Sequence, residues 1–224
     1  MKHLLFTLLT ILLVQLNVFS QELKAKKSRG HFYSEEYNVL ADEKKINHGA
    51  YSRQSLTGTR KLSGQFDHNR PVGDWTYSEN EEAIQTYNYD LQKITFHKKT
   101  DIEYSVNTGS GITVLNVDTP PSYIGSKIAL AQELSNVIKY PMKAKQMGVE
   151  GVVFVEIWVN EDNTLGEIQL IKGIMRECDQ EVIAALKKIP GNWIAATINN
   201  NQLKASFAIG VEYNLDSMPE VAVR

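Results

Sequence analysis

The residues of this chain that could perform chemistry are few and widely separated. The sequence contains five histidines and a single cysteine, Cys178. All the histidines (His3, His31, His48, His68 and His97) lie far upstream of Cys178, and its neighbour Asp179 disfavours a thiolate. A cysteine nucleophile is therefore not expected. Cys178 is instead predicted to be a small buried hydrophobic residue near the start of a helix.

Two histidines raise the question of a metal site. His48 and His68 lie twenty residues apart in turns that look equivalent. The sequence offers no further ligand beside them, so we expect solvated turn histidines, no metal and no cofactor. The chain also lacks a G-x-S-x-G elbow, a phosphate-binding glycine loop and a metal-binding helix motif. We therefore expect that the protein is not an enzyme.

Composition and the amino terminus predict an exported protein. The 224 residues carry a net charge of -2, so there is no basic excess for binding nucleic acid. The start MKHLLFTLLTILLVQLNVFSQE has a basic residue, an apolar run and then small residues at Val18 and Ser20. This pattern predicts a signal peptide over residues 1–20 that is cleaved before Gln21. The alternative is an uncleaved membrane anchor, although the apolar run is shorter than the roughly 20 residues of a spanning helix.

The first folded region is predicted to be an all-β meander of short hairpins. Residues 21–30 read as a charged linker, and residues 31–119 repeat a glycine-x-aromatic pattern, as in Gly64-x-Phe66 and Gly73-x-Trp75. Each unit supplies a turn and a short strand, and several must stack to bury an apolar face. The last strands, up to Val117, are expected to complete this domain before Pro120-Pro121. The pattern resembles MORN-type repeats over about forty residues, and a generic antiparallel meander is an equal alternative.

The pattern then changes to an α+β order of helix, strand, strand, helix and strand. The first helix starts at Ser126, which could cap it, and the second starts at Asp179. A hairpin from Gly151 lies between them, and alternation from Leu203 to Tyr213 predicts a final half-buried strand. The expected domain has two helices on a three-stranded antiparallel sheet. The apolar positions predicted to form its core are Leu130, Leu134, Val137, Ile138, Val153, Val155, Ile157, Val159, Val182, Ala185, Leu186 and Ile189.

Residues 120–216 resemble the carboxyl-terminal domain of TonB-family proteins of Gram-negative envelopes, and residues 217–224 form a tail. The residues that carry the resemblance, most of them with structural roles, are Tyr140, Pro141, Gly148, Gly151, Asp179, Pro190 and Trp193. The resemblance implies a periplasmic binding module. It also implies that the module captures an extended segment of an envelope protein, such as a TonB-dependent outer-membrane transporter, by β-strand addition.

The resemblance places the partner-binding site on the final strand, which we expect at the edge of the sheet. The residues assigned to it are Lys204, Ser206, Ala208, Gly210 and Glu212. A second copy of the chain could cover the same edge and form a homodimer. An inner-membrane-anchored TonB-like energy transducer and a structural dimerising envelope protein are the alternative functions. The chain has only six prolines and no proline-rich spacer, which argues against energy transduction.

Overall fold

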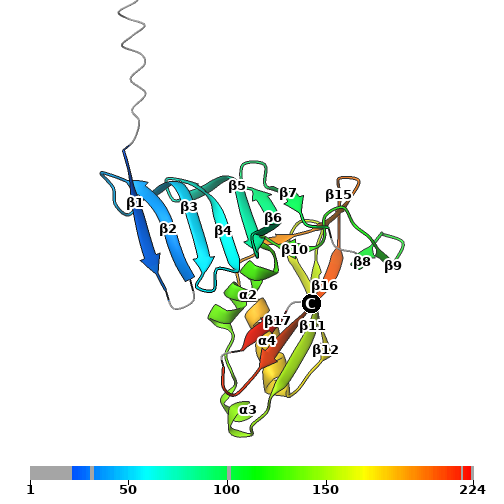
Figure 1. Cartoon of the computed structure of the whole chain (residues 1–224). Coiled ribbons are helices and arrows are strands. Elements are labelled where there is room, and N and C mark those ends of the chain that lie inside the picture. Colours follow the sequence, from blue (N-terminus) through cyan, green and yellow to red (C-terminus); the bar gives the residue numbers. More distant parts are fainter. Residues whose placement is uncertain (1–21, 31–32, 100–101, 218, 223–224) are drawn as a thin grey trace, which may run out of the picture.

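The protein consists of a curved β-meander followed by an α+β unit (Figure 1). The structure, a computed structural model, describes residues 22–30, 33–99, 102–217 and 219–222. The predicted signal peptide and its cleavage site lie outside the described residues.

The meander is a seven-stranded antiparallel sheet in which each strand pairs with the next one along the chain. The prediction of a long meander is therefore confirmed. Its strands are β1 (Leu23–Arg29), β2 (Tyr33–Leu40), β3 (Asn47–Ser55), β4 (Arg60–Asp67), β5 (Arg70–Glu79), β6 (Glu82–Asn88) and β7 (Lys93–His97). The predicted linker 21–30 was wrong, because β1 pairs with β2 from Leu23↔Leu40 to Arg29↔Ser34. An edge strand can be this polar because backbone hydrogen bonds, rather than burial of a face, hold it in place.

The glycine-aromatic pattern forms a row of aromatic rings on one face of the meander. The ring centroids of Phe66 and Trp75 lie 4.9 Å apart, and those of Tyr51 and Phe66 lie 5.3 Å apart. Gly73 has a positive φ of 59° but lies within β5 rather than in a turn, at the register shift between Gln65↔Val72 and Ser63↔Thr76. Gly64 serves a different purpose, because a Cβ there would overlap the indole of Trp75 on the neighbouring strand. The glycines of the pattern thus provide space for an aromatic ring and a strand irregularity, and they do not form the expected turns.

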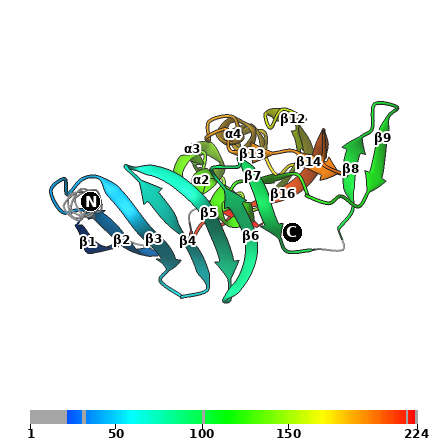
Figure 2. The ribbon, with the colours of Figure 1, turned by 90° about the horizontal axis from the view of Figure 1, so that it is seen from above.

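The second sheet has six strands rather than the predicted three. Its order is β12-β11-β16-β8-β9, and β17 also pairs with β16. The strands are β8 (Tyr104–Asn107), β9 (Ile112–Leu115), β11 (Gly151–Val159), β12 (Leu165–Lys172), β16 (Ala205–Tyr213) and β17 (Glu220–Ala222). The prediction that the strands up to Val117 complete the meander was wrong for β8 and β9. Figure 2 shows this hairpin at the opposite end of the molecule from β1.

Three helices pack with this sheet: α2 (Ser126–Val137), the short α3 (Met142–Gln146) and α4 (Arg176–Leu186). Leu130 and Leu134 of α2 and Val182 and Leu186 of α4 are buried in one cluster with Val153, Val155, Ile157 and Ile209 of the sheet. Helix α4 begins three residues before the predicted Asp179. The carboxylate Oδ1 of Asp179 instead accepts a hydrogen bond from the Ile174 N–H at 3.0 Å, just before the helix. Within the part of the chain that the structure describes, no helix has the length and apolarity to cross a membrane.

Two short strand pairs complete the fold of the second unit. Strand β10 (Ser122–Tyr123) pairs with β13 (Trp193–Ile194), and β14 (Ala196–Ile198) pairs with β15 (Asn201–Leu203). The first pair brings the aromatic rings of Tyr123 and Trp193 to a centroid distance of 5.0 Å. These contacts anchor the segment that leads into α2.

A buried glutamine of the meander joins the two units. Gln85 of β6 is fully buried, and its Oε1 accepts hydrogen bonds from the N–H groups of Gly125 and Ser126 at 2.7 and 3.0 Å. The N-cap residue of α2 is Gly125 rather than Ser126, and Ser126 Oγ accepts a hydrogen bond from the Ile128 N–H at 3.4 Å. Gln85 therefore satisfies backbone donors that a helix start otherwise leaves without partners.

Candidate functional site

Strand β16, predicted to be a free edge, lies inside its sheet. One side pairs with β11 along its whole length, from Ala205↔Val159 to Tyr213↔Gly151. The other side is covered in two places, by β8 at Ala205 and Ser206 and by β17 at Gly210, Val211 and Glu212. The edge-strand prediction was therefore wrong. The alternating pattern of β16 predicts which of its side chains are buried. It does not predict which strands pair with it.

A short unpaired stretch remains on β16 between β8 and β17. The carbonyl of Lys204 accepts a hydrogen bond from the Asn107 N–H at 2.8 Å, which fixes the side that its backbone faces. Backbone groups of every second residue face the same side of a strand, so those of Ser206, Ala208 and Gly210 face that way too. Among the described residues, Ala208 has no strand partner on this side. We call the stretch Phe207–Ile209 the β16 gap.

The β16 gap lies beside a cavity of about 500 Å³ between the meander and the second unit. Phe207 and Ala208 line it from β16, and His97 lines it from β7 of the meander. The remaining lining residues are Glu79, Ile84, Lys98, Ile102, Glu103, Tyr104, Ser105, Pro120, Pro121, Ser122, Tyr123, Ser126, Lys127, Leu130, Glu156 and Ser206. A volume of this size is within the range of ligand-binding pockets, and its mixture of apolar walls and a few charges is typical of them.

The side chains of the five predicted partner-binding residues differ in availability. Lys204 Nζ lies 5.5 Å from the ring centroid of Trp158, and Ser206 Oγ donates a hydrogen bond to Glu156 Oε1 at 2.7 Å. Gly210 is buried, whereas Ala208 and Glu212 are exposed. The backbone of Ala208 is thus the part of the predicted site that is open to a partner.

Burial sets the ionisation of the basic groups in the cavity wall. Desolvation lowers the pKa of His97, and the ammonium of Lys127 lowers it further. The pKa of Lys127 is itself lowered by burial, while the carboxylate of Glu79 acts in the opposite direction. The cavity therefore favours the neutral imidazole of His97.

The residues that carry the family resemblance have structural partners. Tyr140 packs edge-on against Tyr213 with centroids 5.2 Å apart, and its hydroxyl donates to the carbonyl of Val149. The carbonyl of Pro190 accepts a hydrogen bond from the Tyr123 hydroxyl at 3.0 Å. Pro141 is the N-cap residue of α3, Gly148 and Gly151 have positive φ angles of 66° and 140°, and Trp193 is buried.

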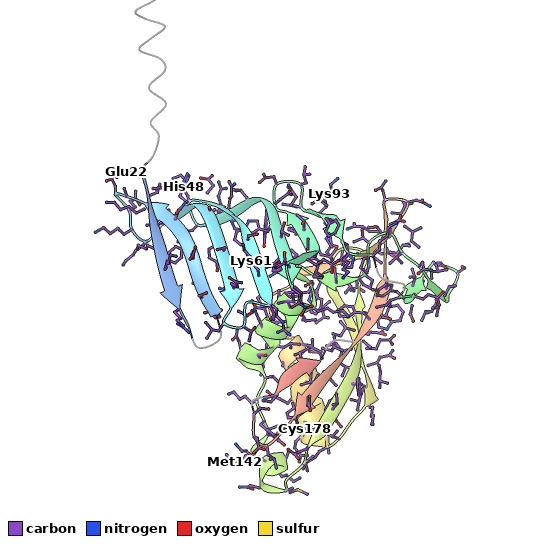
Figure 3. All side chains as sticks on the ribbon, in the orientation of Figure 1. Glu22, His48, Lys61, Lys93, Met142 and Cys178 are labelled. Atoms are coloured by element: carbon purple, nitrogen blue, oxygen red, sulfur yellow. The ribbon has the colours of Figure 1, made fainter. Side chains whose placement is uncertain are left out.

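Cys178 is fully buried in the core of the second unit, where Figure 3 labels it. Burial raises the pKa of its thiol to about 11, and the carboxylates of Asp179 and Glu177 add to the effect. The group is therefore a protonated thiol at neutral pH, as its role as a small core residue requires.

One polar residue, Asp67, lies between the two histidines and was not expected there from the sequence. Asp67 Oδ1 lies 2.6 Å from His68 Nδ1, in a hydrogen bond, and 3.4 Å from His48 Nδ1. The hydrogen bond with His68 is the main reason that the pKa of Asp67 is lowered. The statement that no further ligand accompanies His48 and His68 was thus wrong. Asp67 directly precedes His68, and the pairing of β3 with β4 would have identified it.

Comparison with known proteins finds a family match within the second unit alone. Residues 136–215 match the family described as "Gram-negative bacterial TonB protein C-terminal". Among solved structures, the NMR solution structure of the TonB carboxyl-terminal domain from Helicobacter pylori is similar, at 20% identity and a TM-score of 0.32. The similarity covers 40% of this chain and 94% of that chain. No curated protein matches the chain. The meander lies outside the family match, so its resemblance to MORN-type repeats stays a prediction. Residues 136–215 are therefore similar to the carboxyl-terminal domain of Gram-negative TonB proteins.

Proposed function

We propose that this chain is an exported periplasmic protein that binds an extended segment of an envelope protein at the β16 gap by β-strand addition. A TonB-dependent outer-membrane transporter is the class of partner that the family match favours. The observation that carries the proposal is the backbone of Ala208. Between the stretches of β16 that pair with β8 and β17, it has no strand partner among the described residues, and Ala208 lines the cavity.

The size of the gap limits how the partner is held. From Ser206 to Gly210 the strand advances about 13 Å at roughly 3.3 Å per residue, which allows one or two ladder pairs. Affinity must then also come from side chains that enter the cavity, where Phe207 and Tyr104 provide aromatic walls. Displacement of β17 would extend the available edge through Glu212, because β17 pairs there over three residues.

Substitution of Ala208 tests the role of its backbone. Ala208→Pro removes the N–H that faces the gap, and this N–H is not part of the ladder with β11. Ala208→Thr keeps the N–H and places a strand-favouring side chain at the same exposed position, which makes it the matched control. We expect the proline variant to lose capture of the partner from solubilised Gram-negative envelopes, and the threonine variant to retain it.

Site-specific photocrosslinking identifies which edge the partner contacts. A photoreactive residue at position 208 should give a crosslink to an envelope protein that mass spectrometry can identify. The same residue at exposed Ile171, on the outer strand β12, should not. Crosslinks from position 171 alone would show that the partner adds to β12, and the proposal for the β16 gap would be abandoned.

Export is tested by sequencing the amino terminus of the protein from its native envelope. The proposal expects a mature start at Gln21. A start at Met1 would mean that the segment is retained, and the alternative of a membrane-anchored energy transducer would replace the free periplasmic module.

A further inference from the structure

A separate group of polar side chains lies at one rim of the meander. His48 belongs to β3, Asp67 is the last residue of β4, and His68 is in the turn that follows. One ligand atom from each residue lies within 4.8 Å of the other two. Figure 3 labels His48 at this rim, away from Cys178 in the second unit.

Strand pairing brings the three residues together. The β3–β4 register of Gly49↔Phe66 continues to place His48 opposite Asp67. Asp67 also pairs with Arg70 across a two-residue turn whose central residues, His68 and Asn69, have φ angles of 48° and 66°. Positive φ at both positions is the mark of the tight I′ hairpin turn. The ligand positions are thus set by the backbone of a regular sheet.

The donor atoms suit a transition-metal ion. Two imidazole nitrogens and a carboxylate oxygen form a ligand set that Zn²⁺ and similar ions bind with bond lengths of about 2.0–2.2 Å. Two ligands of a tetrahedral ion at such bond lengths lie about 3.3–3.4 Å apart. The distance between His48 Nδ1 and Asp67 Oδ1 is 3.4 Å. The exposed His68 would have to give up its 2.6 Å hydrogen bond and move by about 0.7 Å.

His48 provides an independent indication. Its Nδ1 atom is shielded from solvent and has no hydrogen-bond partner among the described residues. Shielded polar atoms without partners are uncommon in native proteins, and a bound ion can supply the partner that such an atom lacks. The guanidinium of Arg70 lies 3.4 Å from the other carboxylate oxygen of Asp67, Oδ2, and leaves Oδ1 to the two histidines.

We propose that His48, Asp67 and His68 form a binding site for one zinc-class divalent ion, held by Nδ1, Oδ1 and Nδ1 with solvent at the fourth position. The ion would connect the start of β3 to the hairpin between β4 and β5. The site is independent of strand addition at the β16 gap and lies outside the TonB-type match of residues 136–215.

The test uses the mature chain without a histidine tag, after removal of metal with a chelator. Zn²⁺ is titrated by calorimetry, and Co²⁺ by its visible absorption, which reports four-coordinate geometry. We expect one ion per chain, with affinity reduced about tenfold or more in each of His48→Gln, Asp67→Asn and His68→Gln. Asp42→Asn, which removes a carboxylate at another exposed site of the meander, should bind as the unchanged chain does.

Circular dichroism of every variant shows whether the sheet is retained, because the three ligands are at the surface or half-buried. Loss of binding in folded ligand variants, together with a four-coordinate Co²⁺ spectrum, would support the site. Equal binding by the unchanged chain and the double variant His48→Gln/His68→Gln, or no binding by either, would overturn it.

Discussion

The side chain of Gln85 completes the first turn of a helix that begins 41 residues later in the chain. Its Nε2 also approaches Ser122 Oγ at 3.4 Å, so that both ends of the amide are engaged within the fold. In the sequence, Gln85 is one polar residue among several in a strand, and nothing marks it as buried. A long-range contact of this kind depends on how the two units dock, which local patterns do not encode.

Gln85→Leu should destabilise the protein. The change leaves the buried N–H groups of Gly125 and Ser126 without an acceptor, at about 1–3 kcal/mol each, so that the free energy of unfolding should fall by roughly 2–6 kcal/mol. Urea denaturation followed by circular dichroism measures the change. Gln65→Leu, at an exposed position of β4, is the control and should have little effect. Equal stability of the two variants would mean that Gln85 is not needed to cap α2.

Elements with strong apolar periodicity could be predicted, whereas short polar strands could not. The alternation of β11 and β16 and the start of α2 at Ser126 follow from the sequence, because burial of one face dictates the residue pattern. Strands β1 and β17 have no comparable pattern, whereas β8 was expected as a strand and was assigned to the wrong sheet. They are held by backbone pairing to strands that local patterns do not identify, and β8 and β17 decide which part of β16 is open. The sequence therefore placed the proposed site on β16 with the wrong neighbouring strands.

Removal of residues 219–224 should uncover the edge that β17 occupies. Gly210, Val211 and Glu212 would lose their ladder partners, and buried Val221 would leave the core. An exposed edge favours pairing between chains. Sedimentation velocity should then show a dimer that increases with concentration, and thermal unfolding should occur at lower temperature. Removal of residues 223–224 alone is the control. A shortened chain that stays monomeric would count against this side of β16 as a docking edge.

Residues of both the meander and the second unit line the cavity. His97 and Ile84 come from the meander, while Phe207 and Leu130 come from the second unit. The family match covers only residues 136–215, so the resemblance accounts for one wall of this cavity. A partner segment at the β16 gap would contact residues that the TonB-type domain alone does not supply. Under the proposed function, the meander would take a direct part in selecting the partner.

The stability of the joined molecule should decrease in mild acid because of His97. Burial holds the pKa of its imidazole below the usual value of about 6.5, so the unfolded chain binds more protons as the pH falls through that value. The free energy of unfolding should therefore fall between pH 7.5 and 5, and His97→Gln should flatten this slope. Urea denaturation at several pH values measures it. The pKa values of Glu35 and Glu177 are also lowered, but these carboxylates change the free energy of unfolding only below about pH 4.5, outside the range measured. Parallel slopes for both proteins would exclude His97 as the cause.

The contact between Gln85 and α2 also has a consequence for biosynthesis. Translation proceeds from the amino terminus, so every strand of the meander is made before the residues of α2. The residue that provides the acceptor for the first turn of that helix, Gln85, has then already been synthesised when Gly125 and Ser126 leave the ribosome. The second unit can therefore fold against a meander that is already formed. If the second unit were excised and expressed alone, it would have to begin its first helix without that acceptor.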